Sequence, residues 1–97
     1  MQVIKMDANL FENVRRKLHS TNSANAWEVA GLLSAYQEAA ARARKYECTK
    51  LADSFERTAW EIFELRALPI LQGVYGAYLA VTEDEGAVIA FPNEKEE

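Results

Sequence analysis

The chain has 97 residues, of which 49% are hydrophobic and 27% charged, so it has the composition of one folded domain and not of a disordered chain. Its single cysteine, Cys48, excludes an intrachain disulfide and favours a reducing compartment. Residues 1–18 lack the apolar run of a secretory signal, and the longest apolar stretch, 67–81, is too short and too interrupted to span a bilayer, so we expect a cytoplasmic protein with no membrane contact.

The first two expected elements are a short strand and a helix. Residues 2–6 read QVIKM, a partly β-branched segment that is too short for a stable helix and predicts a strand. Asp7 is the expected N-cap of a helix over 7–19. The apolar positions of that helix share one face, and they are Leu10, Phe11, Val14 and Leu18.

Two longer helices are expected next, over 25–46 and 49–68. Asn25, with Glu28 three residues later, resembles a capping box at the N-terminus of the first of these helices. The apolar stripe that begins at Trp27 does not continue through Glu47 and Lys50. We therefore expect a tight turn within 46–49 and two antiparallel helices, with one long helix as the alternative.

The pattern changes at Pro69, which we expect to end the helical segment because the residue before a proline is disfavoured in the α region. Residues 78–82 and 87–91 then predict a β-hairpin, spanning about 77–91, around the Gly-containing turn 83–86. The expected fold is a helix-dominated α+β domain over 1–92, followed by a charged tail over 93–97.

The residues argue against most enzyme classes. A structural zinc site needs four ligands, and the chain has one cysteine and one histidine. Cys48 and His19 lie on different elements, and we expect a small buried thiol and a solvent-directed imidazole. The four glycines form neither of the phosphate-binding loop patterns. We expect no catalytic residues, no metal and no cofactor.

The basic side chains gather in the first half of the chain and suggest one alternative function. Residues 1–50 carry eight basic and five acidic side chains, whereas residues 51–97 carry three and ten. Basic residues beside aromatic rings suit a phosphate backbone or an unstacked base. A nucleic-acid or nucleotide site would use Arg15, Arg16, Lys17, Arg42, Lys45 and Tyr46. A solvated face with supporting helical ion pairs, such as that of Glu12 with Arg16, is the competing interpretation.

The second half of the chain suggests a protein-binding surface. Its aromatic and aliphatic side chains are too many to be buried easily in so small a domain, and aromatic side chains left outside favour interfaces. A concentrated acidic turn suits a basic channel on a partner. The candidate contact residues are Leu68, Pro69, Ile70, Tyr75, Tyr78, Glu83, Asp84 and Glu85. An unpaired hairpin edge or the alanine-rich helix face would instead support a homo-oligomer.

Three features of the chain occur together: the helical stretch 25–68, the segment LPILQGVYG at 68–76 and the acidic ends. In its small size, acidic balance and lack of a catalytic set, the chain resembles phage-encoded inhibitors of host defence, namely the anti-RecBCD accessory proteins of lambdoid phages and the anti-CRISPR proteins. The resemblance implies a non-enzymatic protein that binds a host protein complex in the host cytoplasm. It assigns no functional residues.

Overall fold

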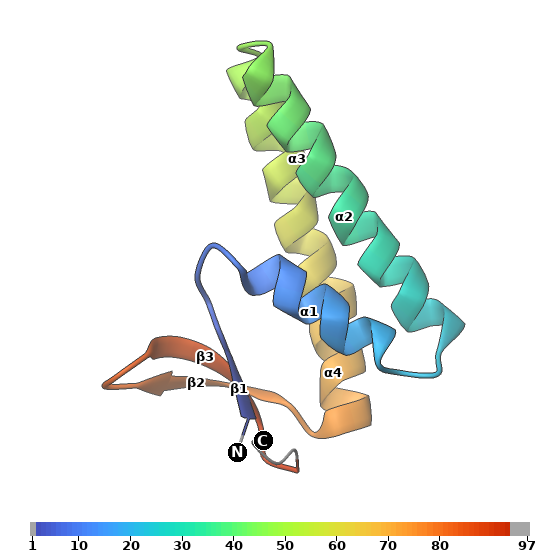
Figure 1. Ribbon diagram of the computed structural model, residues 1–97, viewed down its shortest axis with the longest axis vertical. Coiled ribbons are helices and arrows are strands. Elements are labelled where there is room, and N and C mark those ends of the chain that lie inside the picture. Colours follow the sequence, from blue (N-terminus) through green and yellow to red (C-terminus); the bar gives the residue numbers. More distant parts are fainter. Residues whose placement is uncertain (1, 94–97) are drawn as a thin grey trace.

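The computed structural model describes residues 2–93, and it shows a long helical hairpin standing on a small antiparallel sheet (Figure 1). The helix-dominated α+β class is therefore confirmed. The elements in chain order are β1 (Gln2–Lys5), α1 (Leu10–His19), α2 (Ala24–Lys45), α3 (Thr49–Ile62), the π-helical segment η1 (Phe63–Ala67), α4 (Leu68–Tyr75), β2 (Tyr78–Thr82) and β3 (Gly86–Phe91). Residues 94–97 of the expected tail lie outside the described residues.

Helix α1 buries the predicted apolar face but begins later than expected. Its N-cap is Asn9 and not Asp7, because the Asp7 carboxylate accepts the Asn9 N–H at 2.9 Å and forms a local turn before the helix. The four predicted core positions, Leu10, Phe11, Val14 and Leu18, are all buried.

Helix α2 also has a different cap from the predicted one. Ser23 has extended backbone angles, and its hydroxyl accepts the Ala26 N–H at 3.3 Å, as an N-cap side chain does. The expected cap, Asn25, lies inside the first turn. Its side-chain oxygen instead accepts a 3.1 Å hydrogen bond from Arg66 in η1, a residue 41 positions along the chain.

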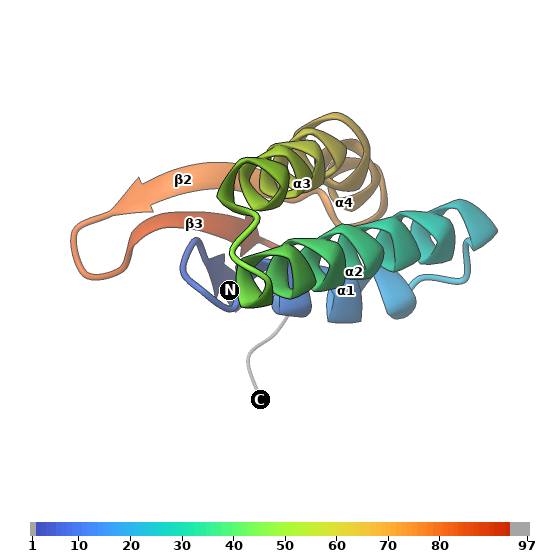
Figure 2. The same ribbon diagram turned by 90° about the horizontal axis from the view of Figure 1, so that it is seen from above.

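The predicted turn between two antiparallel helices is confirmed. The chain reverses at Tyr46–Cys48, where Glu47 has the left-handed φ of 61°. Beyond the turn, α3 runs back beside α2 (Figures 1 and 2). Both helices bury alanines that allow close approach, namely Ala40, Ala43, Ala52 and Ala59.

The prediction that Pro69 ends the helical segment is wrong, because the chain widens into a π-helical turn and then continues as α4. The Leu68 N–H bonds to the Phe63 carbonyl, five residues back. In a regular α-helix the proline ring would clash with the carbonyl four residues earlier, and the wider turn accommodates it. Helix α4 ends at Gly76, which has the left-handed φ of 66°.

The two glycines of this segment provide a matched test of that helix end. A Cβ at Gly73 meets no atom within 4 Å, so Gly73→Ala should stabilise the protein by about 0.5–1 kcal/mol, the usual helix preference of alanine over glycine. Gly76→Ala should destabilise it by about 1–2 kcal/mol, since alanine disfavours the left-handed region. Urea denaturation followed by circular dichroism measures both. Equal effects of the two changes would contradict the assigned helix end.

The sheet places β3 between β1 and β2, and both pairings are antiparallel. Ile89 lies opposite Ile4 on one side and Leu79 on the other. Ile89 and Phe91 join the helices in one core, whose fully buried large side chains also include Phe63, Leu18, Leu33, Leu71, Val14 and Val29. Both β1 and β2 are therefore edge strands of the described sheet. Among residues 2–93, no helix is both long and apolar enough to cross a membrane.

Candidate protein-binding surface

The outer edge strand β2 is uncharged and mostly apolar, and all of its residues except the half-buried Ala80 are exposed. Leu79 is 54% exposed and Val81 85% exposed, and Tyr78 and Thr82 are exposed as well. Leu79 points to the same side of the sheet as Ile89, which is completely buried. The difference follows from strand position, because β2 is the outer strand whereas β3 lies between β1 and β2, and Ile89 packs into the core with the helices.

An acidic turn closes this hairpin. The Thr82 hydroxyl accepts the Glu85 N–H at 3.0 Å and donates to the Gly86 carbonyl at 3.3 Å, so one side chain organises the turn. Gly86 leaves the turn with a left-handed φ of 71°. Glu83, Asp84 and Glu85 are all exposed. The hairpin therefore presents an uncharged apolar strand that leads directly into three carboxylates.

The structure separates the eight predicted contact residues into two groups. Tyr78 lies on β2 and Glu83, Asp84 and Glu85 follow it, so these four share one hairpin. The others lie on α4, where Leu68 is buried and Ile70 packs against the core.

The two remaining α4 residues differ from each other. The hydroxyl of Tyr75 donates to the Lys17 carbonyl at 3.2 Å, and its ring packs on Phe91, so Tyr75 holds α4 against α1 and the sheet. Pro69 is exposed. The segment 68–75 is thus a helix that mainly joins the hairpin to the core.

The first predicted basic group is engaged in contacts within the domain. The Arg15 guanidinium donates to the Ser34 hydroxyl at 3.0 Å, and Arg16 pairs with Glu12 at 2.9 Å. Lys17 bonds the Gln2 side chain at 2.9 Å, and its ammonium lies over the rings of Tyr75 and Phe91. These three side chains do not form one exposed cationic patch.

The second basic group lies near the tip of the helical hairpin. Arg42, Lys45 and Tyr46 line one shallow open groove, which they share with Glu38. Arg44 turns to the neighbouring helix, where it forms ion pairs with Glu56 and Asp53. The hydrogen bond and charge of Glu56 raise the pKa of Arg44, so its guanidinium stays protonated. The structure thus brings together Arg42, Lys45 and Tyr46 of the predicted nucleic-acid site.

The two candidate reactive side chains lie far apart. His19 ends α1 and Cys48 precedes α3, so the 22-residue helix α2, about 33 Å long, separates them. The prediction that Cys48 is buried is wrong, because the hairpin tip extends beyond the core and leaves the thiol exposed. His19 is exposed as expected, with its ring against Trp27. Within residues 2–93, no group of three or more His, Cys, Asp or Glu side chains is placed to hold a metal.

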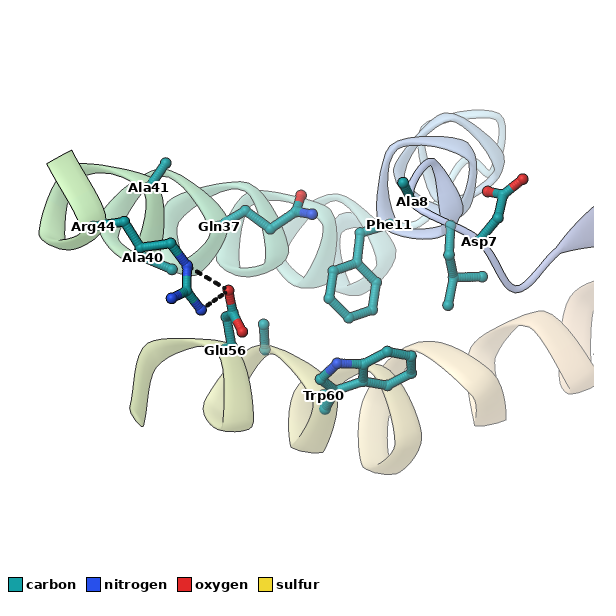
Figure 3. A pocket seen from close by; sticks show the side chains of 11 residues that line it. Asp7, Ala8, Phe11, Gln37, Ala40, Ala41, Arg44, Glu56 and Trp60 are labelled. Carbon is teal, nitrogen blue, oxygen red and sulfur yellow. Dashed lines mark hydrogen bonds and ion pairs between the residues drawn. The ribbon is translucent and has the colours of Figure 1, made fainter. Parts of the chain in front are cut away.

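A pocket between α1, α2 and α3 is a further feature that the sequence patterns did not indicate (Figure 3). It has a volume of about 410 Å³. Its lining combines several alanines, two aromatic rings and one ion pair. The lining residues are Asp7, Ala8, Leu10, Phe11, Gln37, Ala40, Ala41, Arg44, Glu56, Ala59 and Trp60. The alanines spaced along α2 and α3 are the only part of this lining that could have suggested a pocket from the sequence. The same alanines, however, are equally expected where two helices pack closely.

In comparisons with protein-family models, with curated proteins and with solved structures, nothing matches this chain.

Proposed function

We propose that this chain is a non-enzymatic protein-binding module that pairs the outer edge of β2 with an extended segment of a partner protein. The observation that supports it most strongly is the exposure of an uncharged, apolar edge strand. Proteins usually protect such edges with proline, lysine, a bulge or a covering element, because an open edge recruits other strands. Residues 78–82 contain neither proline nor charge, and within 2–93 no further strand pairs with β2.

Strand addition explains how this edge would bind. In an antiparallel ladder, alternate residues direct both backbone polar groups to the same side, so part of the β2 backbone faces outward. A partner strand would satisfy those groups, while the alternating side chains of β2 would select its sequence. Leu79 and Val81 would contact partner side chains on one face, and Tyr78 and Ala80 on the other.

The acidic turn favours a basic partner. A segment paired with β2 would carry its flanking residues past Glu83, Asp84 and Glu85, where lysine or arginine gains from the negative potential. A second copy of this chain has the same net charge of −4 and the same acidic turn, which opposes self-pairing. A nucleic-acid-processing protein has the required basic surface, and inhibition of such a protein is the narrower function we propose.

The test compares a lysine in β2 with a lysine elsewhere. Val81→Lys places a cation on the edge and should reduce partner capture about tenfold or more, corresponding to about 1.4 kcal/mol, because it opposes both strand addition and a basic partner. Leu65→Lys is the control, since Leu65 is also exposed but lies in η1. The immobilised variants would be incubated with bacterial lysate, and the captured proteins quantified by mass spectrometry.

Two outcomes would overturn the proposal. Capture that survives Val81→Lys and is lost in Leu65→Lys would place the binding surface on η1. The second outcome is a dimer of the pure chain that dissociates in Val81→Lys. Light scattering after size exclusion measures the mass of both proteins and would detect it. The β2 edge would then be occupied by a second copy and not by a foreign segment.

A further inference from the structure

The pocket between the helices has an apolar end formed by two aromatic rings. Phe11 from α1 and Trp60 from α3 meet edge to face, with ring centroids 4.9 Å apart, and both contact the buried Phe63. Phe11 is 9% exposed and Trp60 is 42% exposed, so the indole is the larger aromatic surface open to a ligand. Ala40 and Ala59 also line the pocket, and their short side chains leave space in it.

The polar end of the pocket carries an excess of negative charge. Arg44 reaches across from α2 to Glu56 on α3 (Figure 3). Its guanidinium also contacts Asp53, outside the pocket lining, at 3.4 Å. One cation therefore serves two carboxylates. Asp7 also lines the pocket, but its carboxylate accepts the Asn9 N–H and points away from the two rings (Figure 3), so the net negative charge comes from Glu56 and Asp53 around Arg44. The charged groups lining the pocket and paired with Arg44 thus favour a cationic ligand.

We infer that this pocket binds an arginine side chain of a protein partner. A planar guanidinium stacks on an indole face and donates in two directions at once, which a lysine ammonium does not match. The exposed part of the Trp60 indole would provide the stacking surface, and Glu56 and the Gln37 amide, which line the same pocket, would provide acceptors. The inference rests on the proposed function only in that the partner is a protein, because the pocket and β2 are separate surfaces.

N-acetyl-arginine amide is the probe that tests this site. The chain has two tryptophans, so two indole N–H signals are expected in a proton–nitrogen NMR spectrum, and Trp27→Phe assigns them. The Trp60 signal should shift and saturate with a dissociation constant on the order of millimolar, as for a ligand of this size. The Trp27 signal should not move. N-acetyl-lysine amide should cause a smaller shift and N-acetyl-leucine amide almost none.

A matched pair of carboxylate variants tests the charge contribution. Glu56→Gln removes an acceptor and part of the negative charge, and should weaken binding of the arginine amide at least fivefold. Glu61→Gln changes an exposed carboxylate on the same helix outside the pocket and should leave binding unchanged. Equal shifts with the leucine amide, no effect of Glu56→Gln, or no shift of the Trp60 signal would each overturn the inference.

The same titration on Val81→Lys separates this inference from the proposed function. That variant should bind the arginine amide as the unmodified chain does, because Val81 does not line the pocket. Loss of partner capture with normal amide binding would support β2 alone. Normal capture by Val81→Lys together with Glu56-dependent amide binding would support the pocket and contradict strand addition.

Discussion

Replacing Phe63 by alanine should lower the free energy of unfolding by about 3–5 kcal/mol. Phe63 is 1% exposed, and its ring packs against Phe11 and Trp60, so truncation would open a cavity where three helical elements meet. A domain of this size is stable by about 5–15 kcal/mol, so the variant would lose much of that margin. Urea denaturation followed by circular dichroism at 222 nm, a helix-sensitive wavelength, measures the change.

Leu65→Ala is the matched control for this prediction. Leu65 lies two residues from Phe63 in the same π-helical segment, but it is 74% exposed. Its truncation should change the unfolding free energy by no more than about 0.5 kcal/mol. A similar loss in both variants would mean that the π-helical backbone, and not burial of the Phe63 ring, sets the stability of this region.

Introducing a carboxylate at Val29 should be at least as disruptive. Val29 lies in the second turn of α2, is completely buried and belongs to the core. An aspartate there would place an unpaired charge among apolar side chains, at a cost of about 3–5 kcal/mol or more. Val29→Asp should therefore shift the urea midpoint strongly downward or leave the chain without a cooperative transition.

Ala35→Asp adds the same charge to the same helix on its exposed face. Only the lower helix propensity of aspartate should count there, which is less than about 1 kcal/mol. A cooperative transition near the native midpoint in Val29→Asp would contradict the assignment of this α2 face to the core. A large loss in Ala35→Asp would indicate that the opposite face of α2 is buried as well.

Periodicity in the sequence was enough to predict the three strands, the first three helices and their order, but not the π-helical segment or α4. The spacing of Leu10, Phe11, Val14 and Leu18 identified the buried face of the first helix, because side chains three and four residues apart share a helix face. The break in the second stripe at Glu47 and Lys50 correctly predicted the turn between α2 and α3. These signals are local, so a single chain carries them.

The exposed hairpin was only partly predictable. Alternating apolar residues and the acidic turn with Gly86 indicated two strands, and the open edge was one of the expected surfaces. That Leu79 is exposed while Ile89 opposite it is buried depends on the strand order, in which β3 is central and β2 is at the edge. No pattern within residues 78–91 contains that information.

Helix ends were the weakest predictions, because several residues compete for each cap. Asp7 and Asn25 are both good caps by type, yet a local turn engages the first and Arg66 the second. Pro69 usually ends a helix, and here the π-helical turn before it relieves the clash. The burial of Leu68 and the partial burial of Tyr75, both expected at a contact surface, follow from the packing of α4 on α1 and the sheet.

By itself, the sequence determined the helix-dominated α+β class, the order of the strands and of the first three helices, and the residues of the acidic turn, since each depends on neighbours in the chain. The tertiary structure alone decided which charged side chains form ion pairs and which apolar side chains are exposed to solvent. Arg44 meets Glu56 and Asp53 only because α3 folds back on α2, and Trp60 meets Phe11 only because α1 crosses both helices. Such contacts join residues distant in sequence, and their partners are defined only by the packed fold.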